Sequence, residues 1–146
     1  MEQSRKNLKT YSIIVLALAI LALIDMVFEL FFGEINNAQI PEGAPENILL
    51  ITKVVLASIT LLLYLPQVYI GIKGISVAKN PDSSKAHITL GMILFVLTAV
   101  SLISPAMAII RLEDVFGNVA RFLSVAVDAA ILFCYVKYAK IVSKAN

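Results

Sequence analysis

The chain of 146 residues is 60 % hydrophobic and 15 % charged, with a net charge of +2 and a mean hydropathy of +0.89. A soluble domain is about 45–50 % apolar and about 25 % charged, so this composition is not that of one. The single cysteine, Cys134, excludes an internal disulfide and a CxxC redox pair, and the single histidine, His87, excludes bis-histidine haem ligation. The net charge is too small to indicate nucleic-acid binding. We therefore expect no cofactor, no metal site and no nucleic-acid partner.

The first apolar block, residues 11–32, predicts a transmembrane helix, because about 20 apolar residues are needed to cross the hydrocarbon layer. It follows a basic segment, as the apolar region of a secretory signal peptide does. A signal peptide, however, has an apolar region of about 7–15 residues followed by a small-residue cleavage site. This block is longer, contains Asp25 and Glu29, and is not followed by such a site. We expect it to be retained as a helix.

Three further blocks, residues 48–70, 87–110 and 119–138, predict three more transmembrane helices. Proline and glycine mark the loop before the second block, and Asn80-Pro81-Asp82 marks a turn before the third. The blocks are too uniformly apolar for the amphipathic helices of a soluble protein. The sequence therefore predicts an all-α fold: an integral membrane four-helix bundle, up-down-up-down, with short loops, forming a single transmembrane domain over residues 1–146.

Basic residues gather in the segments that an even number of spans places on one side of the membrane. These residues are Arg5, Lys6, Lys9, Lys73, Lys79, Lys85, Lys137, Lys140 and Lys144. The other side carries mainly acidic residues: Glu34, Glu42, Glu46, Glu113 and Asp114. Because short cytoplasmic loops are enriched in Lys and Arg, both termini are predicted to be cytoplasmic. The short loops and the absence of an N-x-[ST] sequon favour the plasma membrane as the location. His87, at the cytoplasmic end of the third block, is expected to be solvated at the interface.

Small and polar side chains recur on one face of each block, at alternating steps of three and four residues. These contact faces are Tyr11, Val15, Leu18, Ala22, Asp25 and Glu29 in the first block; Lys53, Ala57, Thr60, Tyr64, Gln67, Gly71 and Gly74 in the second; His87, Gly91, Leu94, Thr98, Ser101, Pro105 and Ala108 in the third; and Arg121, Ser124, Asp128, Ile131, Tyr135 and Tyr138 in the fourth. Such faces mark helix–helix contacts in membranes, where hydrophobicity alone drives little association. They predict a compact bundle with a left-handed crossing angle of about +20°.

A cluster of five charged side chains falls in the outer half of the predicted spans: Asp25, Glu29, Lys53, Arg121 and Asp128. A charge at mid-membrane costs at least about 2.5–3.5 kcal/mol, so these side chains should face the bundle or water. Either they form an ion-pair network that fixes helix register, or they line an outward-opening pocket for a cation, a proton or an amphiphile head group. Asp128 lies deepest, about 13 Å below the outer surface at about 1.5 Å per residue. We therefore expect Asp128→Leu to impair assembly or activity more than Glu29→Leu.

Pro66 and Pro105 lie inside the second and third blocks, where each removes a backbone donor and can kink its helix. In the segment Tyr64-Leu65-Pro66-Gln67-Val68-Tyr69, the proline-glutamine pair resembles the signature of the PQ-loop transporters, which include the SWEET sugar carriers. Two further helices follow the pair, as that family's three-helix unit requires, although neither carries a second signature. The resemblance implies a carrier function.

Motifs of enzyme active sites are missing from the sequence: it has no H-E-x-x-H, no G-x-S-x-G and no glycine-rich phosphate loop. We therefore expect a non-enzymatic accessory or interaction protein that acts within the bilayer on a membrane-protein partner or on copies of itself. The alternative is a small oligomeric secondary transporter or ion channel that uses Asp25 and Asp128, for which a PQ-loop-like carrier is a remote variant.

Overall fold

The computed structural model describes residues 2–33, 45, 47–81 and 85–144, and the regular secondary structure within these ranges is entirely helical. The helices are α1 (Glu2–Phe32), α2 (Ile48–Lys79), α3 (Ala86–Ser101), α4 (Ile103–Ile110) and α5 (Val115–Lys144). Helices α3 and α4 are two parts of one span, Ala86–Ile110, so four spans are long and apolar enough to cross a membrane. The predicted all-α fold with four such spans is confirmed.

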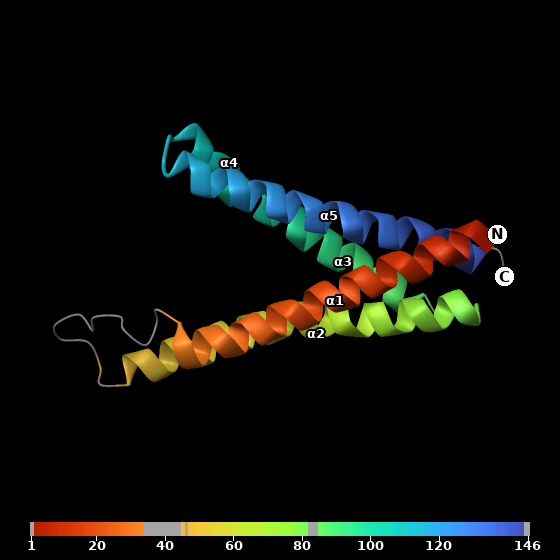
Figure 1. Ribbon diagram of the computed structural model, residues 1–146, viewed down its shortest axis with the longest axis horizontal. Coiled ribbons are helices and arrows are strands. Elements are labelled where there is room, and N and C mark those ends of the chain that lie inside the picture. Colours follow the sequence, from red (N-terminus) through yellow and green to blue (C-terminus); the bar gives the residue numbers. More distant parts are fainter. Residues whose placement is uncertain (1, 34–44, 46, 82–84, 145–146) are drawn as a thin grey trace.

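Three helices run beyond their apolar blocks at the end of the molecule where both termini lie (Figure 1). Helix α1 begins at Glu2, α2 continues to Lys79 and α5 continues to Lys144. One turn inside α1, Lys6 Nζ lies 2.9 Å from Glu2 Oε1, a spacing that favours the helix. Leu8, in the same extension, is fully buried. The apolar blocks therefore understated the helices, because helix formation and packing continue into the charged flanks.

The third span is interrupted near its proline. Pro105 has no N–H to donate to the carbonyl of Ser101, and the helix breaks at Leu102, between α3 and α4. There the Leu102 N–H donates to the carbonyl of Ala99 at 3.3 Å, a tighter turn than that of an α-helix. Helix α2, by contrast, is continuous past Pro66.

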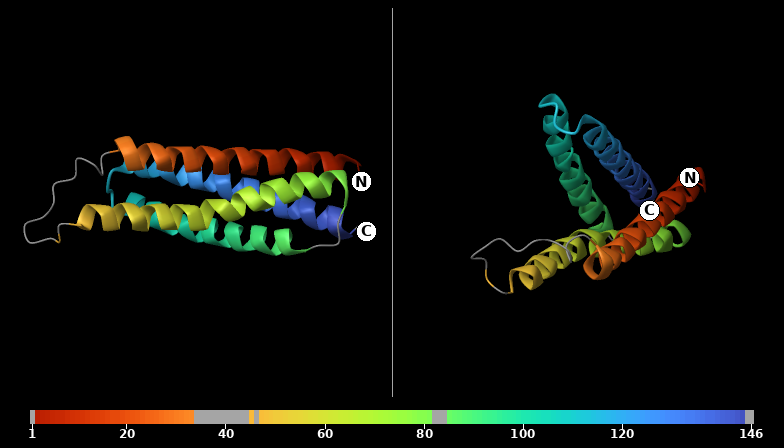
Figure 2. Two further views of the ribbon diagram at one scale, coloured as in Figure 1. Left: turned by 90° about the horizontal axis from the view of Figure 1, so that it is seen from below. Right: turned by 60° about the vertical axis from the view of Figure 1, so that its left-hand side comes forward.

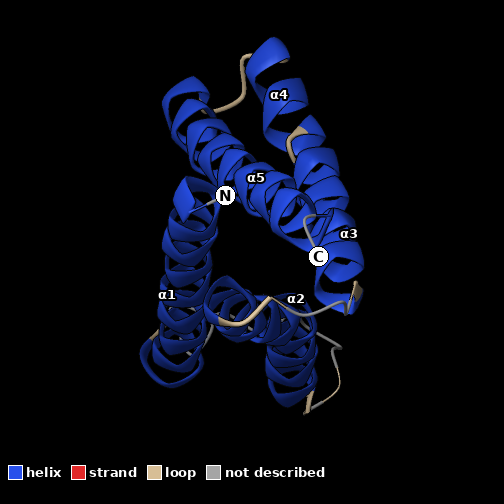
Figure 3. Cartoon of the chain, turned by 90° about the vertical axis from the view of Figure 1, so that its right-hand side faces the viewer, coloured by secondary structure: helices blue, strands red, loops and turns tan. Residues whose placement is uncertain are grey.

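The helices form two arms that diverge from one end of the molecule (Figures 1 and 2). One arm is the hairpin of α1 and α2, and the other combines α3 and α4 with α5 (Figure 3). The arms meet where α1 begins, α2 ends, α3 begins and α5 ends. We call this the closed end, and the opposite end the open end. The prediction of a bundle that is compact along its whole length is therefore wrong.

The buried core lies at the closed end. Its side chains are Leu8, Val15, Ile70, Val77, Ala78, Ile88, Leu94, Leu132, Tyr135, Val136, Ala139 and Val142. The predicted contact faces follow the same division: Gly74 and Gly91 are buried at the closed end, whereas Asp25 and Arg121 are exposed nearer the open end. The faces of α1 and α5 are thus covered by the chain itself at the closed end and exposed nearer the open end.

Glycines explain where the helices approach most closely. A β carbon on Gly71 of α2 would lie 2.8 Å from Cβ of Leu16 and 3.1 Å from its Cα, on α1. A β carbon on Gly74 would overlap Ser12 Oγ of α1 and lie 2.6 Å from Cε2 of Tyr135 on α5. Small residues allow such close packing in membrane proteins. Gly71 thus brings α1 and α2 together within one arm, and Gly74 brings α2 close to α5 of the other arm.

Tyr135 connects the two arms at the closed end. Its hydroxyl donates a hydrogen bond of 3.0 Å to the backbone carbonyl of Ile70, across from α5 to α2. Its ring contacts the glycine positions of both neighbouring helices, Gly74 of α2 and Gly91 of α3. The His87 ring packs edge-on against it, with centroids 6.4 Å apart. His87 is fully buried, so the expectation of a solvated interfacial histidine is wrong: the turn of α3 that carries it packs into the core.

Candidate functional site

Two neighbouring cavities lie directly beside the core, where the arms begin to diverge. Their volumes are about 150 and 160 Å³, and Tyr64, Gln67 and Asp128 line both. The core residue Leu132 lines the first cavity and the core residue Leu94 lines the second. We call these two cavities, with the three shared side chains, the vertex site.

Helix geometry brings the polar side chains of the vertex site together. Tyr64 and Gln67 are three residues apart on α2, so they lie on one face of the helix and point the same way. Asp128 lies on α5, four residues after Ser124, which also lines the first cavity. On the side of the second cavity, α3 contributes Thr98 and Ser101 at the same kind of spacing. All six belong to the contact faces that the sequence predicted.

One acidic charge dominates the vertex site. Of the described residues that line its two cavities, Asp128 is the charged one, and its side chain is half-buried. Tyr64 also lies within electrostatic range of Asp25, on α1. The remaining walls are largely apolar, from residues such as Val15 and Leu97. The arrangement is therefore an apolar pocket with one carboxylate, one aromatic ring and a few neutral polar groups.

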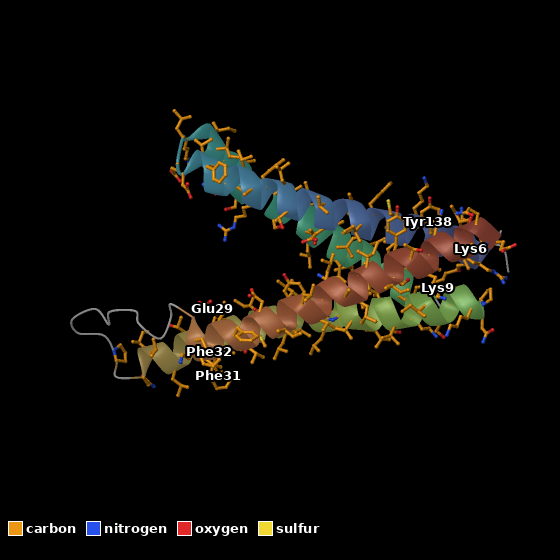
Figure 4. The ribbon with its side chains drawn as sticks, in the orientation of Figure 1. Lys6, Lys9, Glu29, Phe31, Phe32 and Tyr138 are labelled. Atoms are coloured by element: carbon orange, nitrogen blue, oxygen red, sulfur yellow. The ribbon has the colours of Figure 1, made fainter. Side chains whose placement is uncertain are left out.

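The other members of the predicted charged cluster lie elsewhere. Glu29 is exposed on the last turns of α1, beside Phe31 and Phe32 at the far end from Lys6 and Lys9 (Figure 4). Lys53 lines a separate surface pocket with Leu30, Phe31, Val54 and Ala57, between α1 and α2. Arg121 is exposed on α5, in the opposite arm. The structure thus brings Asp128 and Asp25 to the surroundings of Tyr64 and spreads the other three over both arms.

Tyr64 and Gln67 were missing from the predicted charged cluster, although they share the cavities with Asp128. That cluster was defined as the charged residues in the outer half of the predicted spans. Tyr64 and Gln67 were left out because their side chains are neutral. Their position on the predicted contact face of the second block is the signal in the sequence that points to them. A metal centre is a different matter: within the described ranges, no three His, Cys, Asp or Glu side chains lie close enough together to hold an ion.

Comparisons with known protein families, with curated proteins and with solved structures gave no match to this chain. The resemblance to the PQ-loop transporters therefore stays with the pair Pro66-Gln67 alone. What the fold and the site define is a class: an all-helical chain with four membrane-spanning candidates and a polar pocket beside its core.

Proposed function

We propose that the protein is a non-enzymatic, multi-pass protein of the plasma membrane that acts through lateral contacts, as an accessory subunit for another membrane protein. In this proposal a transmembrane segment of the partner packs between the two arms, against the contact faces that the chain does not cover itself. The closed end, which carries the basic flanks of α1 and α5, lies on the cytoplasmic side.

The observation that carries this proposal is the exposure of the contact faces toward the open end. Arg121 and Ser124 on α5, and Asp25 and Glu29 on α1, are exposed although they share their faces with buried core residues. A charged side chain that meets acyl chains costs at least about 2.5–3.5 kcal/mol. The two arms diverge toward the open end (Figure 2). A polar helical segment packed between the arms would shield these groups from lipid, because polar side chains associate across helices in membranes.

The basic residues support the orientation. Lys6 and Lys9 lie at the closed end, as does Tyr138 (Figure 4), and α5 ends at Lys144 there. Three acidic residues on which the orientation also depends, Glu34, Glu42 and Glu46, lie outside the described residues. The short cytoplasmic segments of membrane proteins carry the excess of Lys and Arg, so the closed end is assigned to the cytoplasm.

The proposal is tested by native mass spectrometry of the affinity-tagged chain, extracted from its own membranes in a mild detergent. We expect a stoichiometric protein partner with the wild type and a loss of the partner with Asp128→Leu. The bound fraction should fall by about tenfold or more, because a hydrogen bond from the partner to a charged group contributes about 1.5–3 kcal/mol. Glu29→Leu is the matched control: it removes a carboxylate at the tip of α1, far from the vertex site, and should change the bound fraction less.

Two results would contradict the accessory function. One is recovery of the wild-type chain without a stoichiometric partner, and the other is equal loss of partner in the Asp128 and Glu29 variants. Circular dichroism of each purified variant distinguishes loss of partner from loss of fold.

A small oligomeric secondary transporter or ion channel is the second candidate, and the vertex site favours it. A carboxylate that lines cavities within a membrane span is a common feature of ion and proton pathways, and Asp128 lies in such a position with Asp25 nearby. Counterflow in liposomes containing the purified chain alone separates the two functions. Flux that disappears in Asp128→Asn would replace the accessory function by the transporter.

A further inference from the structure

The geometry points to the vertex site as a binding site for a compact organic ammonium group, held between the carboxylate of Asp128 and the ring of Tyr64. This inference concerns binding alone: it requires neither transport nor the partner proposed above, since the cavities lie beside the core rather than between the ends of the arms.

The charge of the vertex site selects a cation. Asp128 is the charged group among the described residues that line the cavities, and Asp25 adds a second negative charge within range of Tyr64. The two basic members of the predicted cluster do not line either cavity: Lys53 lines another pocket, and Arg121 is exposed further along α5. A half-buried carboxylate among neutral and apolar side chains attracts a positively charged group and repels an anion.

The walls of the vertex site select an organic cation over an inorganic one. Calcium takes about 6–8 oxygen ligands and magnesium about six, whereas these cavities offer one carboxylate and neutral groups against apolar side chains. An aromatic face such as that of Tyr64 attracts ammonium groups, and the attraction grows as water is excluded. Gln67 and Ser124 add oxygen acceptors for the N–H or O–H groups of the ligand.

The volume of the vertex site sets the size of the ligand. A cavity of about 150 Å³ is large enough for a molecule the size of benzene, and the two cavities here measure about 150 and 160 Å³. A trimethylammonium head with a short polar tail fits such a volume. Free choline and the choline head group of a lipid share this chemistry.

The experiment measures choline binding by isothermal titration to the purified full chain in nanodiscs of phosphatidylglycerol. The matched probe is 3,3-dimethyl-1-butanol, which has the shape of choline without its charge. We expect choline to bind at least about tenfold more tightly than the alcohol, as for a charge-assisted contact that is partly buried. In Asp128→Asn the preference for choline should disappear, and in Tyr64→Leu choline binding should weaken about threefold to tenfold.

Two variants serve as controls. Glu29→Gln removes a carboxylate outside the cavities and should leave choline binding at the wild-type value. Tyr69→Leu removes an exposed tyrosine of α2 that does not line either cavity and should likewise have no effect. Circular dichroism checks the fold of every variant. If Asp128→Asn does not fold, Tyr64→Leu against Tyr69→Leu decides the question.

The same titration in nanodiscs of phosphatidylcholine distinguishes the two sources of the ligand. If the site takes a lipid head group, free choline will compete with the bilayer and its apparent affinity will fall; if it takes the free cation, the affinity will be the same in both lipids. Equal binding of choline and its neutral analogue, or wild-type binding in both Asp128→Asn and Tyr64→Leu, would overturn the inference. Failure of these titrations leaves the partner experiment unaffected.

Discussion

Replacing Tyr135 by alanine is expected to lower the free energy of unfolding by about 3–5 kcal/mol, the range for deleting a large buried ring. The ring is fully buried and lies against two glycines, so little around it can move in to fill the space. The substitution also removes the hydrogen bond from Tyr135 to the carbonyl of Ile70, which ties one arm to the other. The two arms should then lose much of their attachment at the closed end.

The measurement is reversible unfolding in mixed micelles, followed by circular dichroism as the denaturing detergent is increased. Tyr135→Phe keeps the ring and isolates the hydrogen bond, for which we expect a loss of about 0.5–1.5 kcal/mol. Tyr69→Ala is the matched control on an exposed tyrosine, with 47 % of its surface accessible, and should have little effect. Equal stability of Tyr135→Ala and Tyr69→Ala would show that Tyr135 does not join the arms as described.

Replacing Gly74 by valine should have the next largest effect, a loss of about 1–3 kcal/mol or more from overpacking. A β carbon at this position meets Ser12 of α1 on one side and Tyr135 of α5 on the other, so relief on one side increases the overlap on the other. Valine adds two further methyl groups at the same point. The expected result is a wedge that separates the first and last helices from α2.

Ser76→Val controls for the lower helix propensity of valine, because Ser76 lies on the exposed face of the same helix two residues later. Gly74→Ala should fall between the wild type and Gly74→Val. Unfolding in mixed micelles gives the loss of stability, and crosslinking between cysteines introduced on α1 and α2 reports their separation. A Gly74→Val variant as stable as Ser76→Val would contradict the close packing at this glycine.

The spans could be predicted from the sequence because hydrocarbon thickness dictates the length of an apolar helix. Their ends could not, because the segments around Lys6, Lys79 and Lys144 are charged and yet remain helical through local pairing and packing. The contact faces were predicted only in part: Leu94 and Tyr135 belong to them and are buried, whereas other core residues such as Val77 lie outside them. Each face is covered only where another helix lies opposite it. The periodicity of one helix does not show where along its length that happens.

Only part of the candidate site could be predicted, because the sequence of one helix does not show which other helix lies opposite it. Counting residues along a helix gives the depth of Asp128, and the structure places Asp128 in the walls of both cavities, which Asp25 does not line. Depth says nothing of lateral position, so Lys53 and Arg121 were grouped with them although Lys53 lines a separate pocket and Arg121 is exposed. The predicted contact face includes Tyr64 and Gln67, but their meeting with Asp128 of α5 follows only from the cavities that the three residues line.

The stacked rings of Tyr11 and Tyr138, with centroids 5.6 Å apart, fasten the first helix to the last near the chain ends. From Tyr138 back to Val115, α5 is a rod of about 35 Å at about 1.5 Å per residue. A rotation of about 5° about that fastening moves the far tip of the rod by about 3 Å, by simple geometry on the same rise. A change in the angle between the arms would therefore move the open end most, and we expect fluorescent labels near Phe32 and Phe116 to report it better than labels beside Tyr11 and Tyr138.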